Sequence, residues 1–340
     1  MSTEKMFLYK IIDNTQFCAT ISYTMNVYKL DLSKYKTELP AIKDAAFRWE
    51  LKYSSRTENK TIGQISYYSV NNTPSDNCII LVPGLASNTR TEPLMRIIEY
   101  WALTVKYDVY CLDTFLGNFL PEQSQELATK HTFAEYIDLI DTGLDRIESE
   151  CKTNKYAYSC LVGHSAGATG IFEIYNKRIS DRKKLRFSAS VLFAPYICND
   201  FVGYIKGFYK HRYFTPETTD KQFDNSVIGI SSPHEPRPDG KFTYISVLPS
   251  IFDVVKQSEF KPELMDRYNI PITLVAGGRD KKSPPEELRK KFNILKSGKN
   301  GHLWKFVIFK DSKHSFIDQY GDWRAIIRLI QSQKKYTKRK

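Results

Sequence analysis

The sequence YAYSCLVGHSAGATG, residues 156–170, holds the features that decide the fold. Its apolar part, Tyr156–Val162, predicts a buried strand, and the residues after the serine are compatible with a helix. The pentapeptide Gly163-His164-Ser165-Ala166-Gly167 between them predicts a sharp turn, with glycines where a Cβ would strike a neighbouring strand or helix. This context predicts that Ser165 is a nucleophile presented at the turn; the alternative is a tight turn with a buried serine.

Apolar runs elsewhere in the chain predict further strands. Cys78–Val82 is continuously apolar, as a strand buried on both faces is. The other buried strands are expected at Val105–Leu112, Phe187–Phe193, Ile272–Ala276 and Lys305–Phe309. Phe133–Ile147 has apolar residues at helical spacing. Because strands alternate with helices, the fold class is predicted to be α/β, with a mostly parallel central sheet of about eight strands flanked by helices.

The remaining segments set the expected domain organisation. Phe47–Tyr53 and Ile62–Val70 alternate apolar and polar residues, which predicts an antiparallel pair at a sheet edge. We expect residues 45–199 and 262–333 to form one core, with residues 1–44 as an N-terminal extension and residues 334–340 as a basic tail. Residues 200–261 are rich in aromatics and interrupt the alternation. This segment is predicted to be an inserted cap over the strand ends, where open α/β sheets bind ligands.

A nucleophilic serine needs two partners, because its hydroxyl is weakly nucleophilic at neutral pH. A histidine must accept its proton, and an acid must orient that histidine and stabilise its positive form. In strand–turn–helix enzymes of this kind the order along the chain is serine, acid, histidine. Asp280 follows the strand predicted at Ile272–Ala276, and His314 follows the one at Lys305–Phe309. Both should therefore lie at the same sheet edge as Ser165.

Other acids and histidines compete for these roles. Asp113 follows a different strand, Asp311 is too near His314 in sequence to reach its ring from the usual direction, and Asp318 is a further candidate. His164 lies in the turn itself and should point beside the nucleophile. No strand end that suits a base precedes His131, His211, His234 or His302, so structural or surface roles are expected for these four and for His164.

An oxyanion hole is the third requirement, since negative charge develops on the carbonyl oxygen during ester cleavage. One donor is expected to be the backbone N–H of Ala166, the residue after the nucleophile. The second should come from the loop Pro83-Gly84-Leu85-Ala86 after the strand Cys78–Val82. Gly84 allows a tight turn that aims the N–H of Leu85, or of Ala86, at the site.

From about Ser66 to Ile330 the chain resembles the α/β-hydrolase superfamily, and within it the monoacylglycerol-lipase, lysophospholipase and serine-aminopeptidase-like group. That group has a Gly-His-Ser-x-Gly turn, a Gly-x-x-Asp turn, here Gly277-Gly278-Arg279-Asp280, and a histidine near the C-terminus. The resemblance implies Ser165, Asp280 and His314 as the triad, with Leu85 and Ala166 as oxyanion donors. Two positions depart from the group: Pro83 replaces the histidine of its His-Gly turn, and its Asp-x-Arg-Gly-His-Gly stretch reads DTFLGN at residues 113–118.

The function that this resemblance implies is cleavage of a carboxylic ester through an acyl-enzyme on Ser165. The aromatic residues of segment 200–261 favour a lipid or another apolar acyl substrate, although most of them are expected to form that segment's own core. Three uses of the same triad stay open: acyl transfer, thioester cleavage and amide cleavage. A non-catalytic binding protein with this fold also stays open, because fold alone does not give function.

Composition bounds the compartment and the partners. The 340 residues include six scattered cysteines, without metal-site spacing, which we expect to be reduced. The N-terminus does not read as a signal peptide, and no apolar run approaches the length of a membrane span, so a cytoplasmic protein without cofactor or metal is predicted. The net charge of +12 is spread along the chain, and no nucleic-acid partner is expected. The basic tail Lys334–Lys340 leaves open a weak contact with an anionic membrane.

Overall fold

The computed structural model describes residues 18–24, 47–54, 59–69, 75–84, 92–114, 133–183, 187–195, 228–229, 244–245, 267, 269–314 and 320–337. The strands are β1 (Cys18–Thr24), β2 (Phe47–Ser54), β3 (Asn59–Tyr68), β4 (Asn77–Val82), β5 (Asp108–Thr114), β6 (Tyr158–His164), β7 (Ala189–Phe193), β8 (Ile228–Gly229), β9 (Tyr244–Ile245), β10 (Ile272–Gly277) and β11 (Trp304–Phe309). The helices are α1 (Glu92–Val105), α3 (Phe133–Asn154), α4 (Ala166–Ser180), α8 (Pro285–Lys296) and α9 (Tyr320–Thr337), with a short 3₁₀ turn at Gly301–Leu303.

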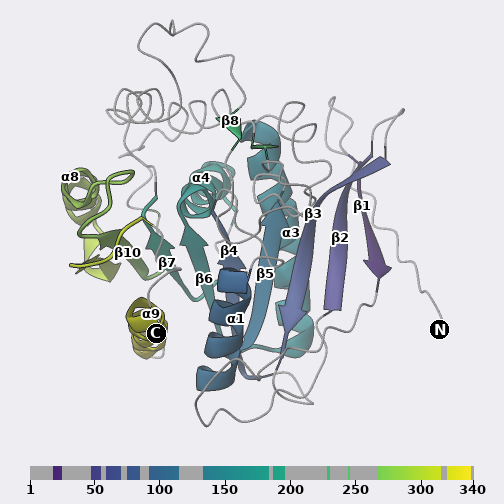
Figure 1. Cartoon of the computed structure of the whole chain (residues 1–340), viewed down its shortest axis with the longest axis horizontal. Coiled ribbons are helices and arrows are strands. Elements are labelled where there is room, and N and C mark those ends of the chain that lie inside the picture. The colour runs from purple at the N-terminus through teal and green to yellow at the C-terminus, as the bar shows by residue number, and fades with distance from the viewer. Residues whose placement is uncertain are drawn as a thin grey trace, which may run out of the picture.

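The main sheet is mostly parallel, as the alternation of strands and helices predicts (Figure 1). Its strand order is β1-β2-β3-β5-β4-β6-β7-β10-β11, which is nine strands in the described part of the chain. The six strands from β5 to β11 in this order pair in parallel. The carboxyl ends of these six strands consequently meet at one edge of the sheet.

The antiparallel edge is one strand larger than the sequence indicates. β2 and β3 form the predicted antiparallel pair, and β3 joins the parallel strands through β5. Cys18–Thr24, inside the segment 1–44 that was set apart as an extension, forms β1 and pairs with β2. Its apolar residues Ala19, Ile21 and Tyr23 alternate with Thr20, Ser22 and Thr24, which is a strand pattern that the prediction of an extension overlooked.

Several predicted element boundaries shift, most clearly at β5 and α3. The strand predicted to begin at Val105 begins at Asp108, because Val105 is the last residue of α1. Lys106 ends that helix with a φ of 55°, and its N–H still donates to the carbonyl of Ala102 at 2.9 Å. The helix predicted over Phe133–Ile147 continues to Asn154.

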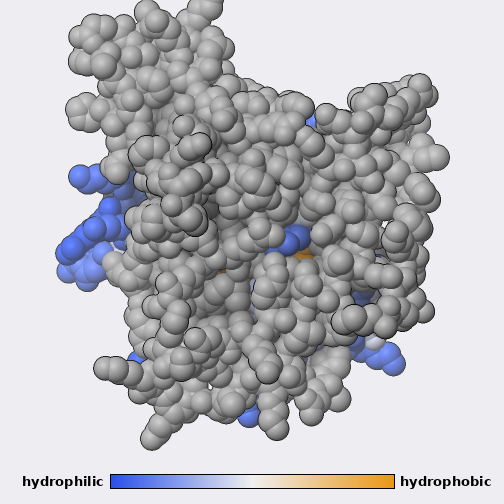
Figure 2. All heavy atoms as spheres, turned by 45° about the vertical axis from the view of Figure 1, so that its right-hand side comes forward, coloured by the Kyte–Doolittle hydropathy of each residue, from blue (hydrophilic) through white to orange (hydrophobic). Residues whose placement is uncertain are grey.

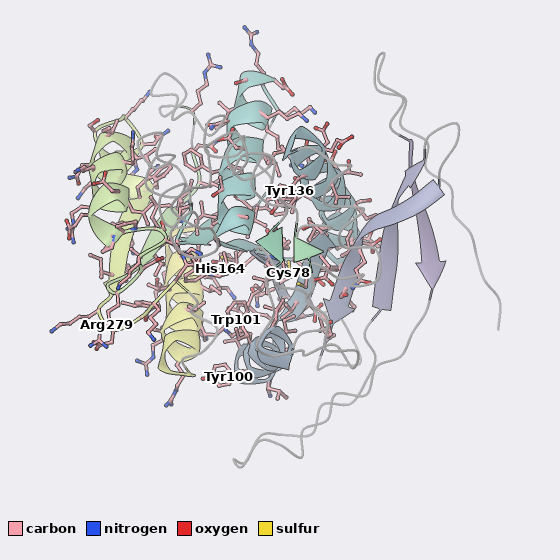
Figure 3. All side chains as sticks on the ribbon, turned by 45° about the horizontal axis from the view of Figure 1, so that its top comes forward. Cys78, Tyr100, Trp101, Tyr136, His164 and Arg279 are labelled. Atoms are coloured by element: carbon pink, nitrogen blue, oxygen red, sulfur yellow. The ribbon has the colours of Figure 1, made fainter. Side chains whose placement is uncertain are left out.

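Helices cover both faces of the parallel strands. α3 and α4 pack together on one face, α1 and α9 pack together on the other, and α8 lies against β10 and β11. Trp101 of α1 and Tyr136 of α3, both almost fully buried, lie on either side of the strand residue Cys78 (Figure 3). Burial on both faces explains why the central strands read as continuous apolar runs.

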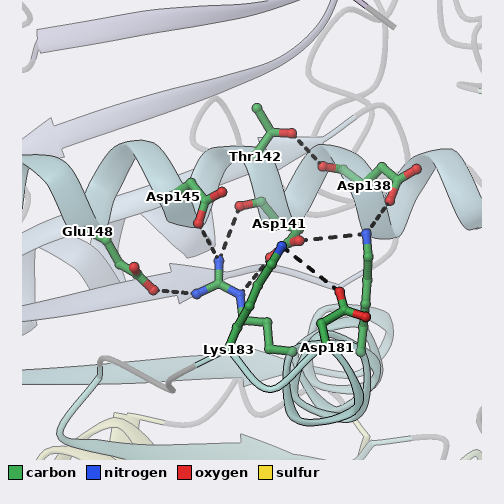
Figure 4. Close-up of polar contacts among 9 residues, drawn as sticks. Asp138, Asp141, Thr142, Asp145, Glu148, Asp181 and Lys183 are labelled. Carbon is green, nitrogen blue, oxygen red and sulfur yellow. Dashed lines mark hydrogen bonds and ion pairs between the residues drawn. The ribbon is translucent and has the colours of Figure 1, made fainter. Parts of the chain in front are cut away.

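A buried ion cluster joins α4 to α3 (Figure 4). The guanidinium of Arg178, on α4, donates to Asp141 at 2.7 Å, to Asp145 at 2.9 Å and to Glu148. Only 4% of the Arg178 side chain is exposed. Since α4 begins directly after Ser165, this cluster helps to fix the helix on which the candidate nucleophile is mounted.

The described surface is largely polar. On the face shown in Figure 2, the described residues that are visible are mostly hydrophilic. Among the residues whose side chains are described, Ile294 is the one large hydrophobic residue that is exposed. Within the same residues, no helix combines the length and the apolar character that crossing a membrane requires.

The described residues do not test the predicted cap and tail. The cap predicted at residues 200–261 lies almost entirely outside the described residues, apart from the short antiparallel pair of β8 and β9. The tail at residues 334–340 is described only as far as residue 337, where α9 ends. Both assignments stay predictions.

Candidate active site

Ser165 lies at the sharp turn between β6 and α4, as the pentapeptide predicts. Its backbone has φ 52° and ψ −120°, a conformation that is costly for a residue with a side chain. The N–H of Ser165 donates to the carbonyl of Phe193 at the end of β7, at 2.8 Å. The hydrogen bond to β7 therefore helps to stabilise the strained backbone conformation of Ser165.

The glycines on either side of Ser165 are required by space. A Cβ on Gly167 would lie 2.2 Å from the carbonyl oxygen of Val82, and one on Gly163 would lie 2.6 Å from the Cα of Ala168. Both distances are far below any contact between non-bonded atoms. The turn can thus pack against β4 and α4 only if these two positions lack side chains.

The structure brings Ser165, His314 and Asp280 together. The Nε2 atom of His314 lies 2.9 Å from the Oγ of Ser165, and its Nδ1 lies 2.8 Å from the Oδ2 of Asp280. The carboxylate accepts the Nδ1 hydrogen, which leaves the lone pair of Nε2 directed at the serine hydroxyl. The Asp280 side chain is fully buried, and 14% of the His314 side chain is exposed.

The Asp280 carboxylate is oriented by its own loop. Its Oδ1 atom accepts hydrogen bonds from the backbone N–H groups of Lys282, at 2.7 Å, and Ser283, at 2.9 Å. The hydroxyl of Ser283 in turn donates to the carbonyl of Pro195, just beyond β7, at 3.1 Å. One carboxylate oxygen is occupied by the loop, so the other is left to the histidine.

Backbone hydrogen bonds fasten the aspartate loop to the histidine loop. The N–H of Gly278 donates to Phe309 at 2.8 Å, and the N–H of Arg279 donates to Ser312 at 2.9 Å. A Cβ on Gly278 would lie 2.3 Å from the carbonyl oxygen of Lys310. The glycines before Asp280 therefore serve the close approach of two loops that follow neighbouring strands.

The competing acids do not reach His314 where they are described. The Asp113 carboxylate is buried on β5 and accepts a hydrogen bond from Gln64 at 2.6 Å. Asp311 pairs instead with Arg279, at 2.9 Å, with both side chains mostly exposed; Arg279 lies at the periphery of the molecule in Figure 3. Asp318 lies outside the described residues.

The other histidines take different positions. His302, in the 3₁₀ turn before β11, is exposed, and His131, His211 and His234 lie outside the described residues. His164 is the exception, because it contacts the site directly. Its Nε2 lies 2.8 Å from the backbone oxygen of His314. Sequence reasoning placed His164 beside the nucleophile but did not find this contact, which depends on a loop 150 positions away.

Ala166, the described donor of the predicted oxyanion hole, lies at the start of a helix, as the first residue of α4. The backbone N–H of Thr169 donates to the carbonyl oxygen of Ser165 at 3.0 Å. The N–H groups of the first helical turn, including that of Ala166, have no acceptor within the helix. They point toward the helix N-terminus, where a developing negative charge is favoured.

The second half of the predicted oxyanion hole is described only as far as Gly84. A Cβ on Gly84 would lie 3.0 Å from the Cβ of Ser165, so the backbone that leaves β4 passes directly beside the nucleophile. Leu85 and Ala86 lie outside the described residues. Leu85 therefore stays a prediction as an oxyanion donor.

The side chains of Ser165, His314 and Asp280 form a chain of hydrogen bonds that can transfer a proton. The imidazole of His314 can accept the proton of Ser165, and the buried carboxylate of Asp280 can stabilise the imidazolium that results. Among the described residues, no group of three or more histidines, cysteines, aspartates or glutamates is arranged to hold a metal ion.

Comparison with solved structures gives the fold. Carboxyl esterase 2 from the fungus Tuber melanosporum is 15% identical, with a TM-score of 0.55, and the match covers 91% of this chain and 90% of that one. An esterase from Pyrobaculum calidifontis is 12% identical, with a TM-score of 0.55 and 85% of each chain covered. No protein-family model and no curated protein matches the sequence. At these identities the likeness is one of fold.

Proposed function

Because the chain has the α/β-hydrolase fold, we propose that it is a serine hydrolase that cleaves a carboxylic ester through an acyl-enzyme on Ser165. The observation that carries this proposal is the hydrogen-bonded series from Ser165 through His314 to the buried Asp280. Two independent distances, each within hydrogen-bond range, link residues from three different loops. A purely structural serine at a turn would not require that series.

In the first step, the Nε2 of His314 accepts the hydroxyl proton while the Oγ of Ser165 attacks the ester carbonyl carbon. The carbonyl π electrons move to oxygen and give a tetrahedral oxyanion. Asp280, fixed by two backbone N–H donors, stabilises the positive imidazole. When the oxyanion collapses, the ester C–O bond breaks, and His314 returns its proton to the alcohol that leaves.

In the second step, water takes the place of the alcohol. His314 accepts a proton from the water as the water oxygen attacks the acyl carbon. When the second tetrahedral oxyanion collapses, the bond between the acyl carbon and the Oγ of Ser165 breaks, His314 returns the proton to Oγ, and the carboxylic acid leaves. We assign the N–H of Ala166 as one donor to both oxyanions and the N–H of Leu85 as the other. Each such donor typically contributes about 3–4 kcal/mol to the transition state.

We further propose that the acyl group is apolar, as in a lipid ester. This part rests on the sequence of residues 200–261, in which aromatic residues are frequent. A segment inserted after β7 follows a strand whose carboxyl end adjoins Ser165, since Phe193 accepts the serine N–H. Aromatic side chains near that edge would favour an alkyl chain over a polar acyl group.

A fluorophosphonate probe tests the nucleophile. The wild-type protein should be labelled, and Ser165→Ala should not. Ser297→Ala is the matched control, because Ser297 is exposed at the end of α8; its labelling should equal that of the wild type. Absence of labelling in folded wild-type protein would contradict the hydrolase assignment, and labelling that persists in Ser165→Ala would contradict the choice of serine.

A series of p-nitrophenyl esters tests the substrate class. If the acyl group is apolar, kcat/KM should rise with acyl length up to chains of about eight carbons or more, since each buried CH₂ contributes about 0.8 kcal/mol. Activity on the acetate alone would argue against a lipid substrate. Full labelling by the fluorophosphonate with no hydrolysis of any ester would point to a different acyl bond or acceptor.

A further inference from the structure

His164 occupies a position between two loops of the candidate site. It is the last residue of β6, immediately before the nucleophile. Its Nε2 lies 2.8 Å from the backbone oxygen of His314, while a Cβ on Gly84 would lie 3.0 Å from its Nδ1. The imidazole of His164 thus contacts the backbone of the loop that carries the base and approaches the backbone that leads to Leu85.

The hydrogen bond fixes the tautomer of His164. A backbone carbonyl only accepts, so the Nε2 of His164 carries the hydrogen and donates it to the His314 oxygen. The two imidazole rings lie at an interplanar angle of 46° with centroids 5.5 Å apart. They are neighbours joined through the backbone of His314, not through its ring, so both ring nitrogens of His314 are left to Ser165 and Asp280.

The environment keeps His164 uncharged. Burial of the ring, together with the nearby His314, lowers the pKa of His164 to about 4, against an ordinary value of 6.5. The hydrogen bond to the His314 backbone and the charge of Asp280 act in the opposite direction, and Lys282 adds to the lowering. A neutral neighbour is what the proposed chemistry requires, because a second positive charge at this distance would oppose the imidazolium that forms on His314.

We propose that His164 is a positioning residue, whose Nε2–H holds the backbone of His314 so that the base lies between Ser165 and Asp280. This inference rests on the proposed function, since it assigns a role toward the same base. His164 touches neither the serine hydroxyl nor the reacting carbonyl in the proposed steps. Its effect passes through the loop of His314, which follows β11 and is otherwise fastened to the loop of Asp280 by backbone hydrogen bonds.

Two substitutions separate the hydrogen bond from the volume of the ring. His164→Gln can place an amide N–H close to the position of Nε2, whereas His164→Phe fills a similar space without a donor. We expect His164→Phe to lower kcat on the best p-nitrophenyl ester about tenfold, the cost of one buried hydrogen bond, with KM unchanged. His164→Gln should keep kcat near the wild-type value, and His302→Gln, at an exposed histidine, serves as the matched control.

A measurement that does not need activity completes the test. In the ¹H NMR spectrum, the His314 Nδ1 hydrogen bonded to Asp280 should give a far-downfield signal, assigned by its loss in Asp280→Asn. The signal should persist in His164→Gln and shift or broaden in His164→Phe. If His164→Phe does not fold, His164→Asn replaces it, because its shorter amide cannot reach the His314 carbonyl.

The outcomes distinguish the two proposals. A wild-type protein that is neither labelled by the fluorophosphonate nor active overturns the proposed function, and the NMR comparison still decides the role of His164. An active wild type together with a fully active His164→Phe and an unchanged signal overturns the positioning role. Equal loss of kcat in His164→Gln and His164→Phe overturns the assignment to the Nε2–H hydrogen bond.

Discussion

The Oδ2 atom of Asp280 lies 2.8 Å from the Nδ1 of His314, and its Oδ1 accepts two backbone N–H groups of its own loop. Since Oδ1 is held by donors on one side of the carboxyl group, Oδ2 faces the imidazole in one orientation. This fixed orientation of the carboxylate predicts how a substitution of Asp280 should affect catalysis.

Asp280→Asn should reduce kcat about 10³- to 10⁴-fold with little loss of stability. If the amide oxygen keeps the two loop donors, its NH₂ group faces Nδ1 and favours the tautomer in which Nε2 carries the hydrogen and cannot accept the serine proton. Asp311→Asn, at the exposed carboxylate that pairs with Arg279, is the control and should leave kcat unchanged. Steady-state kinetics on a p-nitrophenyl ester checks both, and similar losses in the two variants would contradict the role of Asp280.

Gly167→Ala should destabilise the protein, because its Cβ would lie 2.2 Å from the carbonyl oxygen of Val82 and backbone would have to move. We expect a loss of about 2–3 kcal/mol in the free energy of unfolding. Gly170→Ala, one turn further along α4, is the matched control. Its Cβ would meet the flexible end of Ile140 at 2.8 Å, and alanine favours the helix. Urea denaturation of both variants tests the difference, which should be clearly in favour of Gly170→Ala.

Arg178→Met should lower the free energy of unfolding by about 3–5 kcal/mol, because Glu148 and Asp141 would lose the buried guanidinium and Asp141 would keep only Lys177, at 3.7 Å. Lys183→Met provides the comparison, since Lys183 and Asp181 are 4.0 Å apart and about half exposed. An exposed pair of this kind contributes about 0–1 kcal/mol. If urea denaturation gives the same loss of unfolding free energy for both variants, burial does not explain the contribution of the Arg178 cluster to stability.

His164 should make stability depend on pH in a defined window. Its pKa is lowered to about 4 in the folded protein, so between pH 6.5 and 4 the unfolded chain binds a proton that the folded one does not. This linkage is absent above pH 6.5 and destabilises the fold progressively as pH falls through the window, by at most about 3 kcal/mol.

The measurement is the difference in unfolding free energy between the wild type and His164→Gln, determined at a series of pH values. Glutamine does not titrate, so this difference should shift in favour of the variant as pH falls from 6.5 to 4. A difference that stays constant over this range would contradict the lowered pKa of His164.

The strand and helix pattern of the core could be predicted from the sequence because it is local. Continuous apolar runs gave β4, β6 and β10, and the glycines at positions 163 and 167 indicated a turn that only small residues can make. By contrast, the sequence of Cys18–Thr24 alternates apolar and hydroxyl residues over only a few positions, and such a short pattern does not identify its partner, β2. Boundaries such as the start of β5 moved because Lys106 adopts a positive φ that the pattern of apolar residues does not report.

By itself, then, the sequence determined the class of fold, the turn at Ser165 and the chain order of serine, aspartate and histidine. Only the tertiary structure decided that Asp280 and His314 lie within hydrogen-bond distance, that Asp113 and Asp311 have other partners, and that His164 donates to the His314 backbone. The physical reason is the distance along the chain over which each effect acts. Hydrophobic periodicity and turn preferences depend on residues that are near one another in sequence. The contacts of the site instead join loops whose separation is set by the order and register of the strands that they follow.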